Sequence, residues 1–215
     1  MNRYLRSARY FFFALAILAL GYSAYAVLDA KLFQAYQTWR FQRALTAANV
    51  SRAREQRLRP SLLPPAVAEA NRARAANLAL GGGEGTPLGR IEIRAVGLAA
   101  MILEGTEPGT LRRAVGHVPG TALPGQTGNV AIAGHRDTFF RGLRKIQNGD
   151  EITLTTLNGV TRYLVDSTQV VEPSDTRVLD NSPDAILTLV TCYPFSFVGP
   201  APKRFIVRAH KIPLG

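Results

Sequence analysis

The pattern of hydrophobic and polar residues divides this chain into three stretches. Tyr10–Leu28 is a run of 19 residues without a charge. As a helix it would span roughly 28 Å, close to the thickness of a bilayer's hydrocarbon core. The helical spacing of apolar residues continues beyond this run, through Leu32, Tyr36, Trp39 and Phe41. From Arg90 onward the apolar residues come instead in short runs that are typical of strands.

The charges around the apolar run suggest how it is oriented. Three arginines precede it, which predicts that residues 1–9 stay in the cytoplasm: Arg3, Arg6 and Arg9. A cleaved signal peptide is the rival interpretation, because Phe11–Leu20 is the most apolar part and Ala24-Tyr25-Ala26 resembles a cleavage site. We favour an uncleaved single-pass anchor over residues 10–28, since the helical pattern continues without a break. Either outcome places the rest of the chain outside the cytoplasm.

Residues 29–89 are expected to form a juxtamembrane helix and a linker. Prolines interrupt the chain at Pro60, Pro64 and Pro65, and a second Ala- and Arg-rich helical piece is predicted over Ala66–Leu80. The glycines that follow, Gly81 to Gly83, are typical of a flexible joint.

Residues 90–215 are expected to form one mainly β domain with short helices. Strands are predicted over Ile91–Ile93, Ala100–Leu103, Asn129–Ala133, Ile152–Leu157, Val160–Val165, Gln169–Val171, Ala185–Thr191 and Arg204–Arg208, and one short helix over Thr110–Val115. Asn158-Gly159 favours a type I′ turn, in which both central residues have positive φ. Seven or eight short strands in this length predict a closed barrel or a sandwich.

The positive charge is concentrated in the N-terminal part. The chain carries a net charge of +11, and residues 1–89 account for +8, with 12 Lys and Arg against 4 Asp and Glu. A nucleic-acid enzyme usually carries its basic surplus on the folded domain, so nucleic acid is not an expected partner. A basic segment beside an apolar run favours contact with anionic lipids, although a solvated basic stalk without a partner fits equally well.

Two strand ends carry residues suited to nucleophilic catalysis. The only cysteine, Cys192, follows an apolar strand and precedes a loop with Pro194, so no disulfide within the chain is possible. His135 follows another apolar strand in the same way. An imidazole beside a thiol stabilises the thiolate and can later donate a proton to a leaving amine. Taken singly, Cys192 also fits a small buried hydrophobe, and His135 a loop residue bonded to the backbone.

Other polar residues are candidates for weaker reasons. Arg204 begins a strand 12 residues after Cys192, so a loop can return it close to the thiol, where a guanidinium would stabilise an oxyanion or hold a carbonyl. A surface arginine is the plainer interpretation. His117 lies in a turn-rich loop, which favours a structural or substrate-lining role over a catalytic one. No residues have structural-zinc spacing, no cofactor is expected, and no acidic cluster supports a calcium site.

Together these residues resemble the sortase family. The resemblance rests on Gly128–Thr138, on Thr188-Leu189-Val190-Thr191-Cys192-Tyr193-Pro194-Phe195, and on Ala201–Val207 downstream. The Thr-x-x-Thr-Cys strand with a later arginine is the family's pattern, and the Tyr-Pro-Phe and Ala-Pro-x-Arg-Phe details are most similar to class D sortases. The similarity covers about Arg90 to His210, and the anchor and stalk match the usual layout of such proteins.

The resemblance implies a closed eight-stranded β-barrel and a cysteine transpeptidase. It implies that Cys192 is the nucleophile, His135 the general acid and base, and Arg204 the residue that stabilises substrate and oxyanion. Thr191 is similar to a family position that contacts the substrate. The implied partners are a protein with a Leu-Pro-x-Thr-Gly-like sorting signal, cleaved through a thioester, and an amine acceptor in the cell wall or in another subunit.

Three alternatives remain open from the sequence. A cysteine peptidase would use the same site with water as the acceptor. A wall-remodelling L,D-transpeptidase also uses His, Cys and Arg, but the Ser/His-Gly-x-x-Cys context typical of that family is absent here. A membrane-tethered β-domain that only binds a partner would leave Cys192 inert.

Overall fold

The structure is a computed structural model that describes residues 2–197 and 199–213, except for residues 59–82. In chain order its elements are α1 (Asn2–Leu58), β1 (Pro87–Ile93), η1 (Arg94–Val96), β2 (Leu98–Glu104), α3 (Pro108–Arg113), β3 (Val115–His117), β4 (Asn129–Ala133), η2 (Phe139–Lys145), β5 (Glu151–Thr156), β6 (Gly159–Val171), η3 (Thr176–Leu179), β7 (Ile186–Tyr193) and β8 (Lys203–Ile212). The helix predicted over Ala66–Leu80 and the prolines before it lie outside the described residues, as do Gly81 and Gly82.

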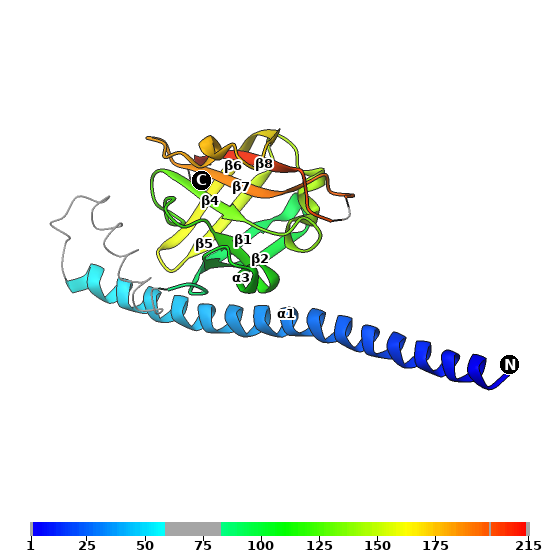
Figure 1. Cartoon of the computed structure of the whole chain (residues 1–215). Helices are drawn as coiled ribbons and strands as arrows, with labels where there is room; N and C mark the ends of the chain where they lie inside the picture. Colours follow the sequence, from blue (N-terminus) through cyan, green and yellow to red (C-terminus); the bar gives the residue numbers. More distant parts are fainter. Residues whose placement is uncertain (1, 59–82, 198, 214–215) are drawn as a thin grey trace.

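The eight strands form a closed barrel, as the family resemblance implied, whereas the strand pattern alone also allowed a sandwich (Figure 1). Around the barrel their order is β1-β2-β3-β4-β7-β8-β6-β5. The β2–β3 and β4–β7 pairs are parallel, and the other pairs are antiparallel. The parallel pair β4–β7 brings together two strands that are separated in the chain by η2, β5, β6 and η3, so their carboxyl ends meet at one end of the barrel.

Most predicted strands are confirmed, with two differences. The segments predicted over Val160–Val165 and Gln169–Val171 are one strand, β6, whose pairing with β8 shifts register between Val165 and Ser167. The short strand β3 was not predicted. In the described part of residues 90–215, three short 3-10 helices, η1 to η3, accompany α3, whereas the sequence pattern indicated only one helical piece there.

The predicted type I′ turn at Asn158-Gly159 is wrong. Thr156 pairs with Gly159 across the hairpin, so Leu157 and Asn158 form the turn and Gly159 begins β6. Gly159 has φ +140°, and no described residue other than glycine has a positive φ. The Thr156 hydroxyl accepts a hydrogen bond from the Asn158 amide (3.1 Å) and donates one to the Gly159 carbonyl (3.3 Å). These bonds move the turn one residue toward the N-terminus.

The barrel interior is filled by apolar side chains that alternate along the strands. The largest fully buried ones include Tyr163, Phe140, Ile91, Ile93, Ile102, Ile132, Leu143, Ile152, Leu154, Leu187 and Leu189. Tyr163 is the polar exception, because its hydroxyl is buried without a hydrogen-bond partner among the described residues. Burial raises the pKa of Tyr163 to about 12. The rigid interior holds the strand ends in fixed relative positions.

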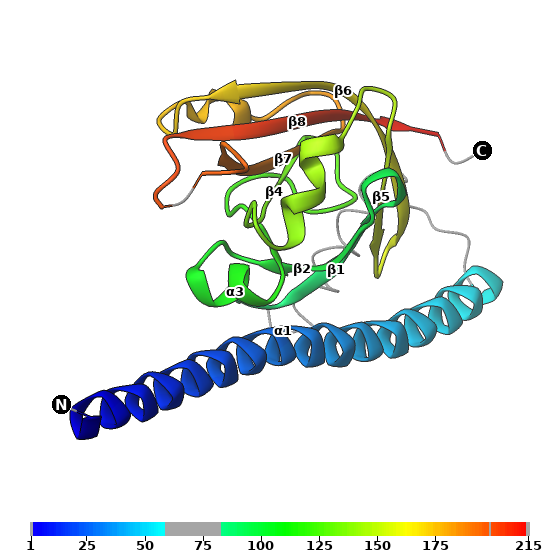
Figure 2. The ribbon, with the colours of Figure 1, turned by 90° about the vertical axis from the view of Figure 1, so that its right-hand side faces the viewer.

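The long helix α1 has two parts that differ in their contacts. Its later part packs on the outside of the barrel beside β1, β2 and α3 (Figure 2). Phe41 is only 3% exposed and packs against Met101, Leu103 and Ala114. Gln34 donates a hydrogen bond to the Arg113 carbonyl (2.7 Å) and accepts one from the Met101 amide (2.9 Å).

The earlier part of α1 extends beyond the barrel. The first ion pair to the barrel is made by Asp29, whose carboxylate is 3.0 Å from the Arg113 guanidinium. Before it, the large apolar side chains from Tyr10 to Tyr25 are exposed. Ala8–Val50 is long and apolar enough to cross a membrane, with a mean hydropathy of 2.1 in its most apolar window.

Candidate active site

The three residues predicted to carry chemistry lie at the same end of three neighbouring strands. Cys192, near the end of β7, pairs in register with Arg204, near the start of β8. On the other side of β7, Ala133 of β4 pairs with Val190, 57 positions later in the chain. His135 is also 57 positions before Cys192. Because the Gly134 amide donates to the Val190 carbonyl (3.1 Å), the pairing continues past the end of β4 toward His135.

These residues belong to the outer face of the barrel wall. Successive side chains of a strand point to opposite faces. Leu187 and Leu189 of β7 belong to the interior cluster, and so does Val207 of β8. Cys192 and Arg204 are out of phase with these residues, and both are partly exposed, while His135 is exposed. The thiol and the imidazole therefore come from strands that lie side by side, and not from opposite sides of the barrel mouth.

Two buried hydrogen bonds hold β4 and β7 in register. Near one end, the Thr188 hydroxyl donates to Oδ1 of Asn129 (2.7 Å). At the other end, the Thr191 hydroxyl donates to the Gly134 carbonyl (2.7 Å), directly before His135. In this structure the buried Thr191 side chain fixes the position of the neighbouring strand end, and its predicted contact with the substrate stays a prediction.

The Arg204 guanidinium lies against the backbone at the start of its own strand. Its Nη1 donates to the carbonyls of Ala201 (3.2 Å) and Lys203 (3.0 Å). Nε and Nη2 have no acceptor among the described residues, so they remain able to donate to a bound molecule. This leaves two donor nitrogens of the planar fork beside the thiol-bearing strand.

Aromatic side chains anchor the chain directly after the thiol. Tyr193 stacks on Phe205 with ring centroids 6.2 Å apart, and Phe195 packs edge-on against Phe205 at 5.3 Å. Phe195 and Phe205 also pack against the barrel interior. The loop between β7 and β8 is therefore anchored at its beginning.

Arg136 is a residue of the site whose role the sequence analysis missed. Its Nη1 donates to the Pro194 carbonyl (3.1 Å), and its Nη2 donates to the carbonyls of Phe197 (2.6 Å) and Gly199 (3.0 Å). It thus joins the segment that follows β4 to the loop that follows Cys192. Its position directly after His135 could have indicated a role in the site. Its hydrogen-bond partners, however, are backbone carbonyls of a distant loop, and no sequence pattern reveals these.

His117 is 2% exposed and holds the loop between β3 and β4. Its Nδ1 is 2.9 Å from a Glu104 carboxylate oxygen, and its Nε2 is 2.9 Å from the Ala122 carbonyl. The Thr121 hydroxyl also lies 3.1 Å from Nε2, so both ring nitrogens have polar partners within the protein. The ring's neighbours indicate a structural role in this structure, and the predicted substrate contact stays a prediction.

The described residues contain no group of three His, Cys, Asp or Glu side chains arranged to hold a metal ion. The carboxyl groups of Glu84 and Glu107 share a hydrogen bond, and Glu107 is the residue directly before α3. That bond is the main cause that raises the pKa of Glu84 and lowers the pKa of Glu107.

The sequence of this chain is similar to those of known proteins. The sequence profile described as the sortase domain matches residues 91–212. Sortase D of Bacillus subtilis (strain 168) is 35% identical over 129 residues, which cover 60% of this chain and 65% of that protein. Sortase A of Listeria monocytogenes (serovar 1/2a, strain EGD-e) is 31% identical over 109 residues, 49% of each chain. The matched stretches thus span less than two thirds of the relatives' own length.

Solved structures agree with this assignment. A sortase D5 transpeptidase of Clostridium perfringens superposes with a TM-score of 0.59 at 33% identity, covering 67% of this chain and 89% of that one. A lid mutant of sortase A from Corynebacterium diphtheriae gives 0.60 at 30% identity, covering 71% and 97%. With the domain profile matching more than half of the residues, and with the barrel described above, this chain belongs to the sortase family.

Proposed function

We propose that this protein is a membrane-anchored cysteine transpeptidase with Cys192 as nucleophile, His135 as general acid and base, and Arg204 as the stabiliser of the oxyanion. The observation that carries the proposal is the alignment of the three positions at one end of β4, β7 and β8. Membership of the sortase family supports it.

In the first half of the reaction the Cys192 thiolate attacks the carbonyl carbon of the scissile peptide bond. Nε and Nη2 of Arg204, which have no acceptor in the described part of the chain, are suited to the negative charge that develops on the carbonyl oxygen. The tetrahedral intermediate then collapses. The C–N bond breaks, the leaving amine takes a proton from the His135 imidazolium, and a thioester to Cys192 remains.

In the second half an amine attacks the thioester carbonyl. Neutral His135 accepts the proton that the amine loses, the C–S bond breaks, and the thiolate is regenerated. The product is a new peptide bond to the acceptor. Attack by water in place of the amine would make the protein a cysteine peptidase.

The proposed substrate is a protein with a Leu-Pro-x-Thr-Gly-like sorting signal, and the proposed acceptor is an amine of the cell wall or of another protein subunit. The proposed location is the cell membrane, crossed once by residues 10–28, with residues 1–9 in the cytoplasm and the barrel outside. The barrel contacts of α1, which begin directly after this segment, support that placement.

The test uses the full chain in detergent micelles with a fluorogenic Leu-Pro-x-Thr-Gly peptide, with and without a small amine. We expect cleavage, a ligated product when the amine is present, and loss of both in Cys192→Ala. Cleavage without ligation at any amine concentration would favour the peptidase. Full cleavage by Cys192→Ala, or a wild-type thiol that forms no adduct with a thiol-reactive probe, would contradict the proposal.

A further inference from the structure

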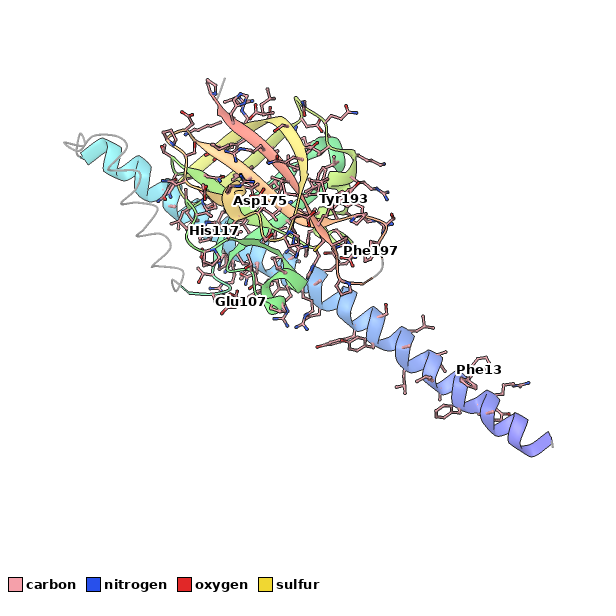
Figure 3. The ribbon with its side chains drawn as sticks, turned by 45° about the horizontal axis from the view of Figure 1, so that its top comes forward. Phe13, Glu107, His117, Asp175, Tyr193 and Phe197 are labelled. Atoms are coloured by element: carbon pink, nitrogen blue, oxygen red, sulfur yellow. The ribbon has the colours of Figure 1, made fainter. Side chains whose placement is uncertain are left out.

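The end of the barrel that carries Cys192 faces the same way as the N-terminal half of α1. Figures 1 and 2 show the connection between β7 and β8 extending from the barrel toward the side on which the blue half of α1 leaves it. In Figure 3 the labelled Phe197 lies on that side of the barrel, toward the part of α1 that carries Phe13. If α1 crosses a bilayer, this loop is turned toward the bilayer surface.

The side chain at the tip of this loop is apolar. Phe197 is 45% exposed, although the other aromatic rings of the loop region pack on the barrel. The Arg136 guanidinium lies 5.8 Å from the centre of the Phe197 ring, in addition to its bond to the Phe197 carbonyl. An aromatic ring beside a cation is a combination that suits the boundary between water and lipid head groups.

A cavity of about 740 Å³ lies directly beside Phe197, and its lining is basic. Arg136, Arg141 and Arg144 line it, together with one carboxylate, that of Asp137. The side chains of Arg141 and Arg144 are exposed, and neither guanidinium has an ion-pair or hydrogen-bond partner among the described residues. The lining therefore carries a net positive charge that its own residues do not neutralise. This charge favours binding of an anion from outside the protein.

We propose that this loop and the cavity form a second membrane contact, in which Phe197 enters the head-group region and the arginines bind anionic phospholipid head groups. The proposal rests on the membrane insertion of α1 proposed above. The contact would hold the thiol-bearing end of the barrel at the bilayer surface. It would therefore restrict the enzyme to peptide bonds that lie close to the membrane.

Spin labelling tests the position of the loop, and the sequence makes it simple because Cys192 is the only thiol. In a Cys192→Ala background, a nitroxide label is attached at Phe197→Cys, or at the control Val160→Cys. Val160 is similarly exposed, at 44%, and lies on the β5–β6 hairpin at the other end of the barrel. Accessibility to oxygen and to an aqueous nickel chelate is measured for the full chain in phosphatidylcholine vesicles with and without phosphatidylglycerol.

With phosphatidylglycerol present, we expect the label at 197 to become severalfold more accessible to oxygen relative to the nickel chelate, while the label at 160 stays aqueous. Equal aqueous accessibility at the two positions would overturn the proposal. A third label, at Leu18→Cys, reports insertion of α1. If that label stays in water, the anchor fails and this proposal falls with it, whereas the cleavage assay in detergent would be unaffected.

The charge dependence is tested with Arg141→Gln/Arg144→Gln. An arginine near an anionic surface contributes about 1 kcal/mol, so the double variant is expected to lower the ratio of bound to free loop roughly thirtyfold. The label at 197 should then lose its response to phosphatidylglycerol. With Cys192 intact, the same double variant should cleave and ligate peptide normally in detergent. Lost activity there would overturn the proposal, because the cavity would then bind the soluble substrate or acceptor.

Discussion

The Arg204 guanidinium holds its hydrogen-bond donors in one plane, which the ammonium group of a lysine does not. Its Nη1 is occupied by the Ala201 and Lys203 carbonyls, and the remaining donors lie in one plane. A lysine cannot bond the backbone and present a second planar donor at the same time. We expect Arg204→Lys to lower kcat/KM by about 100-fold or more, the loss typical of a missing oxyanion donor, measured with the fluorogenic peptide.

Arg208→Lys is the matched control for this variant. Arg208 lies four residues further along β8, on the same face, and pairs with Thr188 away from the thiol. Its replacement should leave kcat/KM within a few-fold of wild type. Near-normal turnover by Arg204→Lys would remove Arg204 from the proposed mechanism.

The buried Tyr163 hydroxyl affects stability, and its effect depends on pH. Its pKa is raised from 10.0 to about 12, so the fold binds this proton more tightly than the unfolded chain does. The associated stabilisation is complete below pH 10 and is lost as the pH rises toward 12. In Tyr163→Phe the free energy of unfolding should fall less steeply as the pH rises above 10. At pH 7 it should be neutral or stabilising by about 1 kcal/mol, because an unpaired buried hydroxyl is removed.

Denaturant unfolding of Tyr163→Phe and wild type at pH 7 and pH 11 checks this prediction. Tyr193→Phe serves as the control, since its partly exposed ring stacks on Phe205 at the surface. Equal pH dependence in Tyr163→Phe and wild type would show that folding does not raise the pKa of Tyr163.

At the scale of elements, the loop between β7 and β8 depends on Arg136. Three of its carbonyls accept hydrogen bonds from this one side chain. Arg136→Ala removes the link between the segment after His135 and the loop after Cys192. We expect kcat/KM to fall about tenfold, with faster hydrogen exchange in the loop, while the thermal midpoint of the barrel changes little. Arg141→Ala, on the same side of the barrel, should leave both quantities unchanged.

Hydrogen-exchange measurements distinguish an Arg136 that positions the loop from an Arg136 that contacts the substrate directly. If Arg136→Ala loses activity without faster exchange in the loop, its role would be direct contact with the substrate. If neither quantity changes, the three hydrogen bonds would be unimportant for the position of Cys192.

Much of the fold could be predicted because strand composition and strand ends are local features. Cys192 and His135 were singled out because each follows an apolar run, and both runs are strands. The short strand β3 has only three residues, too few for a periodic pattern to appear. The pairing that aligns His135 with Cys192 joins distant segments. The sequence indicated this pairing only through the family resemblance, because the residues of a strand do not specify which strand lies beside it.

At the scale of the whole molecule, α1 and the barrel are joined by a small interface around Phe41. This ring packs between Met101, Leu103 and Ala114 on the outer side of the barrel. Phe41→Ala should weaken the interface by about 3 kcal/mol, the usual cost of removing a buried phenyl ring. In hydrogen exchange of the full chain in detergent, the amides of residues 29–45 should exchange faster, while the barrel interior stays protected.

Tyr36→Ala is the control, because Tyr36 lies in the same segment of α1 but is exposed. It should leave the exchange of residues 29–45 as in wild type. If Phe41→Ala also leaves it unchanged, then α1 does not stay on the barrel in solution. A fixed orientation of the catalytic end relative to the membrane would then be lost.

Closure of the barrel limits how an extended peptide can be recognised. Among the described strands, each one has a partner on both sides over at least part of its length, so none is a complete edge strand to which a peptide could add. Selectivity must then come from side chains on the outer face and from the connecting loops. Grafting such loops from a relative should therefore exchange peptide preference while the scaffold stays intact.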